Sequence, residues 1–110
     1  MTRQEIIRDV TRRLVDYYQP ERVYLIGSSA RGEDHPESDL DFVVVLPDDA
    51  PREKLVGSHI QQRLWGVPVT VDVVPFRRST FNARSGWLMS LPAIALCEGI
   101  LEYDSATGAD

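Results

Sequence analysis

Three aspartates in this sequence have the type and spacing that could carry chemistry. Asp39 and Asp41 stand two residues apart at the start of an apolar run, so on a β-strand both carboxylates point to one face, roughly 6–7 Å apart. Asp72 lies in a later run of β-branched residues, where a buried charge must be neutral, paired or metal-bound. Because oxygen ligands select hard cations, the pattern indicates a site for Mg²⁺ or Mn²⁺.

A glycine turn supplies the second half of the pattern. Gly27 and Ser28 directly follow the apolar run 23–26, and ten residues separate Ser28 from Asp39. The missing Cβ lets a ligand approach the backbone, and the serine hydroxyl and the amides of a following helix can face an anion. If the two aspartate-bearing strands are neighbours, two cations could join the carboxylates to a bound triphosphate and an attacking hydroxyl, for in-line displacement at phosphorus.

Other polar residues near the turn allow more than one interpretation. Arg31 could reach a phosphate, or it could pair with Glu33 or Asp34. Ser38 could orient the carboxylates or only start the strand, and we expect His35 to be a solvated side chain of a polar loop.

The aspartates have structural alternatives too. Asp39 and Asp41 could be a turn carboxylate followed by a solvated strand residue. Asp72 could form a salt bridge with an arginine such as Arg77 or Arg78. If it is a site residue, Asp72 would complete the shell of one metal and help to deprotonate the incoming hydroxyl.

Hydrophobic periodicity and turn residues predict the elements that must position these side chains. The fold class is α/β, with a small mixed sheet of about four strands flanked by helices. We expect a helix over 3–18 with a capping box, a strand over 22–26, a short helix through 31–32 capped by Ser28 or Ser29, a strand over 39–46, a helix from about 55 to 65, a strand over 67–75, a short helix or turn over 79–85, a helix from 90–92 to Gly99, and a strand over 100–103.

Length, charge and cysteine usage limit the functional classes. The 110 residues fit a single domain, 1–110, with a flexible tail at 105–110. A net charge of −5 argues against a protein that reads a nucleic-acid backbone, and no apolar run is long enough for a membrane span. With no export signal and one cysteine, Cys97, the sequence favours the cytoplasm, and Cys97 is expected to be an inert core residue.

Four large apolar residues are expected in the core or at its edge: Trp65, Phe81, Trp87 and Met89. If several of them are exposed together, they would mark a surface for a partner.

Taken together, the run Gly27-Ser28-Ser29-Ala30-Arg31-Gly32 and the run Ser38-Asp39-Leu40-Asp41 resemble the signature of the minimal nucleotidyltransferases, in the polymerase-beta-like nucleotidyltransferase superfamily. The resemblance extends from about Val23 to Tyr103. It implies that Gly27 and Ser28 bind the triphosphate, that Asp39 and Asp41 are metal ligands, and that Asp72 is the third carboxylate.

The resemblance also implies a reaction and a partner. Minimal members of this family often pair with a helical HEPN-type protein in toxin–antitoxin modules, where the transferase can attach AMP to a tyrosine of the partner. We therefore expect transfer of AMP from ATP to a hydroxyl of a partner protein. The sequence also allows the chain to form an oligomer. The alternatives are a non-catalytic antitoxin that acts by contact, and an enzyme that modifies an antibiotic-like small molecule with a second chain completing its site.

Overall fold

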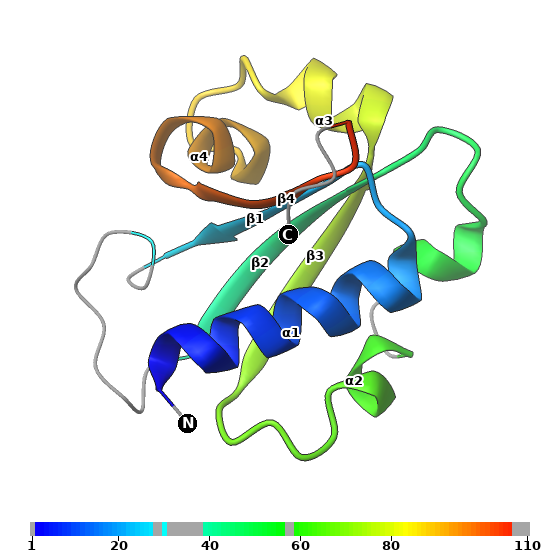
Figure 1. Cartoon of the computed structure of the whole chain (residues 1–110). Coiled ribbons are helices and arrows are strands. Elements are labelled where there is room, and N and C mark those ends of the chain that lie inside the picture. Colours follow the sequence, from blue (N-terminus) through cyan, green and yellow to red (C-terminus); the bar gives the residue numbers. More distant parts are fainter. Residues whose placement is uncertain (1, 28–29, 31–38, 57–58, 107–110) are drawn as a thin grey trace.

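The computed structural model of the chain describes residues 2–27, 30, 39–56 and 59–106. The elements, shown in Figure 1, are α1 (Arg3–Tyr18), β1 (Arg22–Ile26), β2 (Leu40–Leu46), the 3₁₀ helix η1 (Arg52–Leu55), α2 (Ile60–Arg63), β3 (Val71–Arg77), α3 (Arg78–Arg84), α4 (Leu91–Glu98) and β4 (Ile100–Asp104). They confirm the expected α/β class. Across the described ranges, no helix combines the length and apolar character needed to cross a membrane.

α1 begins and ends where its sequence predicts. The Thr2 side chain accepts a hydrogen bond from the Glu5 amide, and the Glu5 carboxylate accepts one from the Thr2 amide, which completes the capping box. The helix ends at Gln19, whose φ of 52° is left-handed, and Pro20 follows. Both ends are therefore fixed by local interactions.

The four strands form one mixed sheet in the order β3-β2-β1-β4. β1 is antiparallel to β2 and β4, whereas β2 and β3 are parallel. Two parallel strands begin at the same end of a sheet, and an antiparallel neighbour ends there. The C-terminal end of β1 therefore lies beside the N-terminal ends of β2 and β3. We call this end of the sheet the site end.

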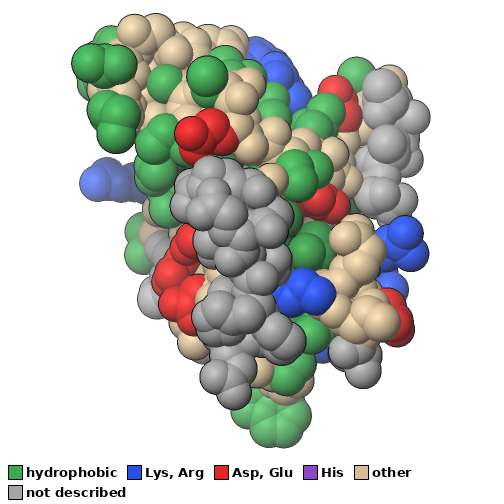
Figure 2. All heavy atoms as spheres, turned by 90° about the vertical axis from the view of Figure 1, so that its left-hand side faces the viewer, with side chains coloured by type: hydrophobic (Ala, Val, Ile, Leu, Met, Phe, Trp, Pro, Cys, Tyr) green, Lys and Arg blue, Asp and Glu red, His purple; other side chains and the backbone are tan. Residues whose placement is uncertain are grey.

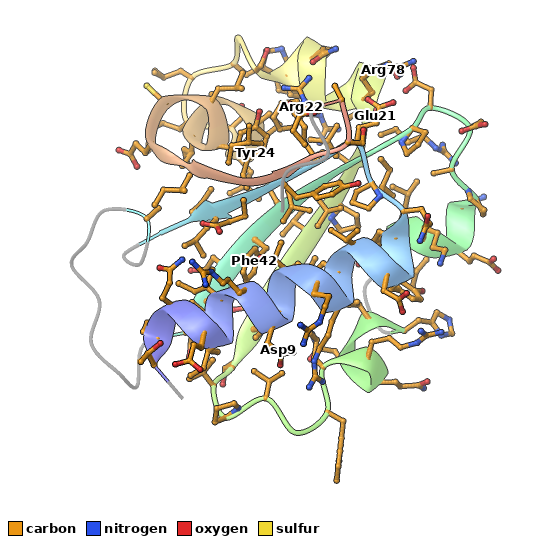
Figure 3. The ribbon with its side chains drawn as sticks, in the orientation of Figure 1. Asp9, Glu21, Arg22, Tyr24, Phe42 and Arg78 are labelled. Atoms are coloured by element: carbon orange, nitrogen blue, oxygen red, sulfur yellow. The ribbon has the colours of Figure 1, made fainter. Side chains whose placement is uncertain are left out.

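Helices cover both faces of the sheet. α1 lies on one face, and α3 and α4 lie on the other (Figure 1). Because successive strand residues point to opposite faces, Leu25 and Phe42 join the core beneath α1, while Tyr24 and Val43 join Phe81 and Ala95 beneath α3 and α4. In Figure 3, Phe42 lies on the α1 side of the sheet and Tyr24 on the α4 side.

Two predicted boundaries are wrong. In place of one helix over 55–65 there are η1 and the single turn of α2, and the sequence between them contains Gly57 and Ser58, which are poor helix formers and lie outside the described residues. β3 begins at Val71 rather than at residue 67, because Gly66 turns the chain with φ +88° and Pro68 cannot donate to a sheet ladder.

The expectation that Cys97 is an inert core residue is also wrong, because its side chain is exposed on α4. Ala95 takes the inward position on that helix and is fully buried. Cys97, two residues further on, points away from the sheet, since two residues turn an α-helix by more than half a circle. The expected short helix at 31–32 and most of the expected flexible tail lie outside the described residues.

Candidate active site

Gly27 directly follows β1, in a conformation that suits glycine, and lies against Asp41. Its φ is +80°, and a Cβ built there would stand 2.7 Å from Oδ2 of Asp41. A side chain at this position would therefore be strained and would also displace the carboxylate. The structure brings the predicted glycine turn together with one of the predicted aspartates.

Asp41 and Asp72 are direct neighbours in the parallel pair of β2 and β3, where their Cα atoms are in register. Hydrogen-bonded strands lie about 4.8 Å apart, so the two carboxylates start from adjacent positions. The amide of Leu40 donates to the carbonyl of Thr70 at 2.9 Å, which ties the beginnings of the two strands together. The predicted neighbouring of the two aspartate-bearing strands is confirmed.

The charges of both other aspartates act on Asp41. Burial is the largest cause that raises its pKa, followed by the negative charges of Asp72 and Asp39 and by a side-chain hydrogen bond with Asp72. Asp39 precedes β2 and is exposed, and Asp72 is exposed as well. The site end thus places Asp72 directly beside Asp41, with the charge of Asp39 near enough to act on the Asp41 carboxylate.

The carboxylates of Asp41 and Asp72 point to the face of the sheet that carries α3 and α4. Asp41 is paired with Ile26, which belongs to the core beneath those helices, and Asp72 occupies the position in register with Asp41. Figure 2 looks at the molecule from the left-hand side of Figure 1, and acidic side chains gather there beside atoms that are not described.

Among the described residues, the two arginines considered as partners of Asp72, Arg77 and Arg78, bind elsewhere. Arg77 donates from Nη2 to the carbonyl of Ala50 at 2.9 Å. Arg78, the first residue of α3, pairs with Glu21 at 2.6 Å and with Asp48 at 3.3 Å. Figure 3 shows the Glu21–Arg78 pair at the end of the sheet opposite the site end.

The donor set suits a divalent cation held jointly with a nucleotide. Within the described ranges, no three histidine, cysteine or carboxylate side chains stand close enough to hold an ion by themselves. Mg²⁺ is commonly held by one or two carboxylates together with substrate phosphates, so the Asp41–Asp72 pair beside Gly27 fits such a cation. A cation there would also relieve the repulsion that raises the pKa of Asp41.

Three predicted nucleotide-binding residues, Ser28, Arg31 and Ser38, lie outside the described residues, and so does His35. Their roles stay predictions.

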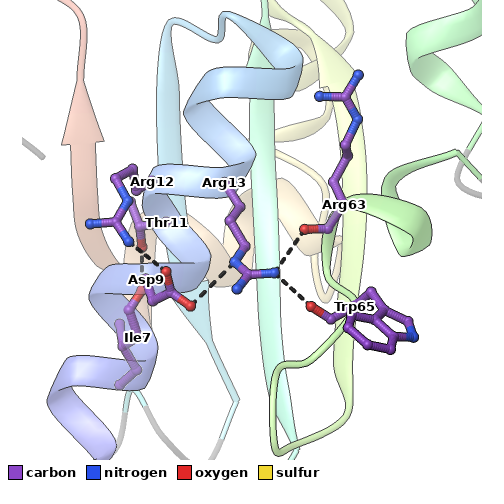
Figure 4. A network of polar contacts seen from close by, with 7 residues as sticks. All are labelled: Ile7, Asp9, Thr11, Arg12, Arg13, Arg63 and Trp65. Carbon is purple, nitrogen blue, oxygen red and sulfur yellow. Dashed lines mark hydrogen bonds and ion pairs between the residues drawn. The ribbon is translucent and has the colours of Figure 1, made fainter. Parts of the chain in front are cut away.

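Arg13 makes a structural link that the sequence did not indicate. From α1 its Nη1 donates to the carbonyls of Arg63 at 3.1 Å and Trp65 at 2.9 Å, and its Nε pairs with Asp9 at 3.2 Å (Figure 4). These bonds tie α1 to the turn that precedes β3. Arg13 is one of several charged residues on a polar helix face, so periodicity alone gave no signal for this role.

Comparison with known proteins gives one family and a shared fold. The model of the family described as Nucleotidyltransferase domain matches residues 5–94. Curated proteins give no match to the chain. A proposed nucleotidyltransferase from Sulfolobus solfataricus has a similar structure, with a TM-score of 0.63 and 16% identity over 96% of this chain and 84% of its own.

Two further solved structures are similar. A toxin–antitoxin crystallised with AMP-PNP has a TM-score of 0.60 and 18% identity, over 91% of this chain and 75% of its own. A mutant of the toxin–antitoxin MntA–HpeT has a TM-score of 0.60 and 17% identity, over 97% of this chain and 77% of its own. At these identities the likeness shows a common fold.

Proposed function

Because the chain belongs to the nucleotidyltransferase domain family, we propose that it transfers a nucleoside monophosphate, AMP from ATP, to a hydroxyl group of a partner protein. The observation that carries this proposal is the register of Asp41 with Asp72, with Gly27 packed against the Asp41 carboxylate. In such an arrangement the carboxylates can bind a metal ion, and the glycine after the strand lets a phosphate approach the backbone.

In the proposed reaction the oxygen of the acceptor hydroxyl forms a bond to the α-phosphorus of ATP. The bond between the α-phosphorus and the bridging oxygen breaks, and pyrophosphate leaves with that oxygen. Asp72, exposed at the site end, accepts the hydroxyl proton. Gly27 leaves room for the Asp41 carboxylate and lets the phosphates approach the backbone.

Asp39, Asp41 and Asp72 would hold one or two Mg²⁺ or Mn²⁺ ions, which when bound neutralise the phosphates and acidify the hydroxyl. The chain's own contribution is to hold Asp41 and Asp72 side by side. Burial and the nearby charges of Asp72 and Asp39 raise the pKa of Asp41 in the free protein, so a bound cation would favour the charged form of this carboxylate. Ser28, Arg31 and Ser38 are proposed to bind the nucleotide.

Two observations on similar proteins support ATP and a protein acceptor. One toxin–antitoxin of the same fold was crystallised with AMP-PNP, an analogue of ATP. The other is a mutant of MntA–HpeT, also a toxin–antitoxin. We propose by analogy that this chain acts as an antitoxin whose acceptor is a helical HEPN-type partner.

An assay with the adjacent gene product tests this proposal. The purified chain is incubated with ATP, Mg²⁺ and the protein encoded next to it, and the partner is examined by intact mass spectrometry for added AMP. Loss of the added mass in Asp39→Ala and Asp41→Ala supports the proposal. Inhibition of the partner that survives both substitutions without ATP would instead identify a module that acts by contact.

A further inference from the structure

An exposed apolar surface lies on the α3–α4 layer, away from the residues of the proposed reaction. Its members, which we call the α4 patch, are the exposed Trp87, Leu88, Met89 and Cys97 and the half-buried Ile94. The exposed fraction is 94% for Leu88, 75% for Met89 and 59% for Trp87. Hydrophobic side chains are visible at the top of the face in Figure 2. Such a concentration on a small protein is typical of an interaction site.

The turn that displays these side chains is held in a fixed shape. Met89 has a φ of 65°, a left-handed conformation that is strained for a residue with a side chain. The Ser90 amide donates to the Trp87 carbonyl at 3.2 Å, and the Ser90 hydroxyl donates to the Arg84 carbonyl at 2.6 Å. The Arg84 guanidinium lies 5.4 Å from the Trp87 ring centroid. The turn therefore presents Leu88 and Met89 outward in a defined conformation.

A hollow lies beside these protruding side chains. It has a volume of about 360 Å³, and its lining includes Trp87, Met89, Ile94 and Cys97. On α4, Ile94 and Cys97 are three residues apart and so share a face of the helix. The patch thus combines an apolar protrusion and an apolar hollow within one surface.

We propose that the α4 patch is the interface of a twofold dimer of this chain. In a twofold contact the same surface meets itself, so Leu88 of each copy fills the hollow of the other. Trp87, Leu88 and Met89 together expose on the order of 450 Å², below the ~800 Å² that each partner contributes to a standard interface, which fits a weak, concentration-dependent dimer.

The charges around the patch permit this pairing. The Arg84 guanidinium lies beside the Trp87 ring and Glu98 lines the hollow, so charges of both signs lie at the rim. A rim of one sign would repel a second copy, whereas a mixed rim matches itself under a twofold rotation. A second copy therefore satisfies the shape and the charge of the patch, and this proposal does not depend on the proposed reaction.

Sedimentation analysis across micromolar to millimolar concentrations tests the proposal. We expect a monomer–dimer equilibrium for the wild-type chain, and a dissociation constant raised tenfold or more by Leu88→Glu, which would bury a charge at the contact. Leu88 is almost fully exposed, so this variant should fold normally. The matched control is Trp65→Glu, at a residue that is 86% exposed and lies outside the patch; its dimerisation should be unchanged.

Cys97 gives a second readout because it is the one cysteine of the sequence and lines the hollow. Its alkylation rate should fall several-fold as wild-type concentration rises, and should not change with concentration in Leu88→Glu. A wild-type chain that stays monomeric at millimolar concentration overturns the proposal, as does a dimer that Leu88→Glu leaves intact. Protection of Cys97 only by a different protein would show that the patch serves another partner, and would also overturn it.

Discussion

Replacement of Gly27 by alanine tests the arrangement at the site end most selectively. The substitution adds a Cβ at a φ of +80°, 2.7 Å from Oδ2 of Asp41. The backbone strain costs about 1–2 kcal/mol, which lowers Tm by about 5–10 °C in a domain of this size. The clash falls on the end of a flexible side chain, so Asp41 can rotate away at little further cost to stability.

The cost to activity should be much larger. A carboxylate displaced by 1 Å can cost about 100-fold in rate, because metal and phosphate must be held in a defined geometry. We therefore expect Gly27→Ala to transfer nucleotide at least ~100-fold more slowly while remaining folded.

Gly66→Ala provides a matched control. Its φ of +88° imposes similar backbone strain, but no atom of the described residues lies within 4 Å of the new Cβ, neighbouring residues aside. Both variants should lose similar stability in thermal denaturation, and only Gly27→Ala should lose transfer activity. Equal activity of the two variants would refute the claim that Gly27 makes room for the Asp41 carboxylate.

Three further predictions concern the site and its supports. Asp41→Asn should lower transfer at least ~100-fold, yet raise Tm at neutral pH without metal. The raised pKa of Asp41 means that its protonation stabilises the fold, a gain that is present at acid pH and is lost as the pH rises through that pKa. The variant should therefore show a flatter dependence of Tm on pH than the wild type, and an equal dependence would contradict this. Arg13→Ala should lower the unfolding free energy, measured by urea denaturation, by about 1–2 kcal/mol and speed hydrogen exchange near residues 63–66. Arg12→Ala, which removes only an exposed ion pair with Asp9, should lower it by under about 0.5 kcal/mol. Thr2→Ala should cost about 1 kcal/mol in the same assay, and no loss would show that the capping box contributes nothing.

Elements fixed by local interactions could be predicted from the sequence. α1 runs between the residues that its capping box and Pro20 indicate, and β1 has the predicted bounds. The alternation around Asp72 also predicted its outward side, because Val71 is buried while Asp72 is exposed. In these segments the periodicity of two or 3.6 residues and the terminal residues agree.

Features set by tertiary contacts could not be predicted. α4 is apolar on all sides, so its sequence does not distinguish inward Ala95 from outward Leu96 and Cys97. The register of Asp41 with Asp72 depends on how the link through η1 and α2 returns the chain to the sheet. Spacing alone could suggest that the aspartates meet, but it could not fix which two lie side by side.

Labelled ATP gives the most direct test of nucleotidyl transfer. The chain, Mg²⁺ and the adjacent gene product are incubated in parallel with ATP labelled at the α-phosphate and with ATP labelled at the γ-phosphate. The proposed reaction places label on the partner protein from the α-labelled nucleotide alone and releases the γ-label in pyrophosphate. Label on the partner from the γ-position would show phosphoryl transfer and would contradict the proposed function.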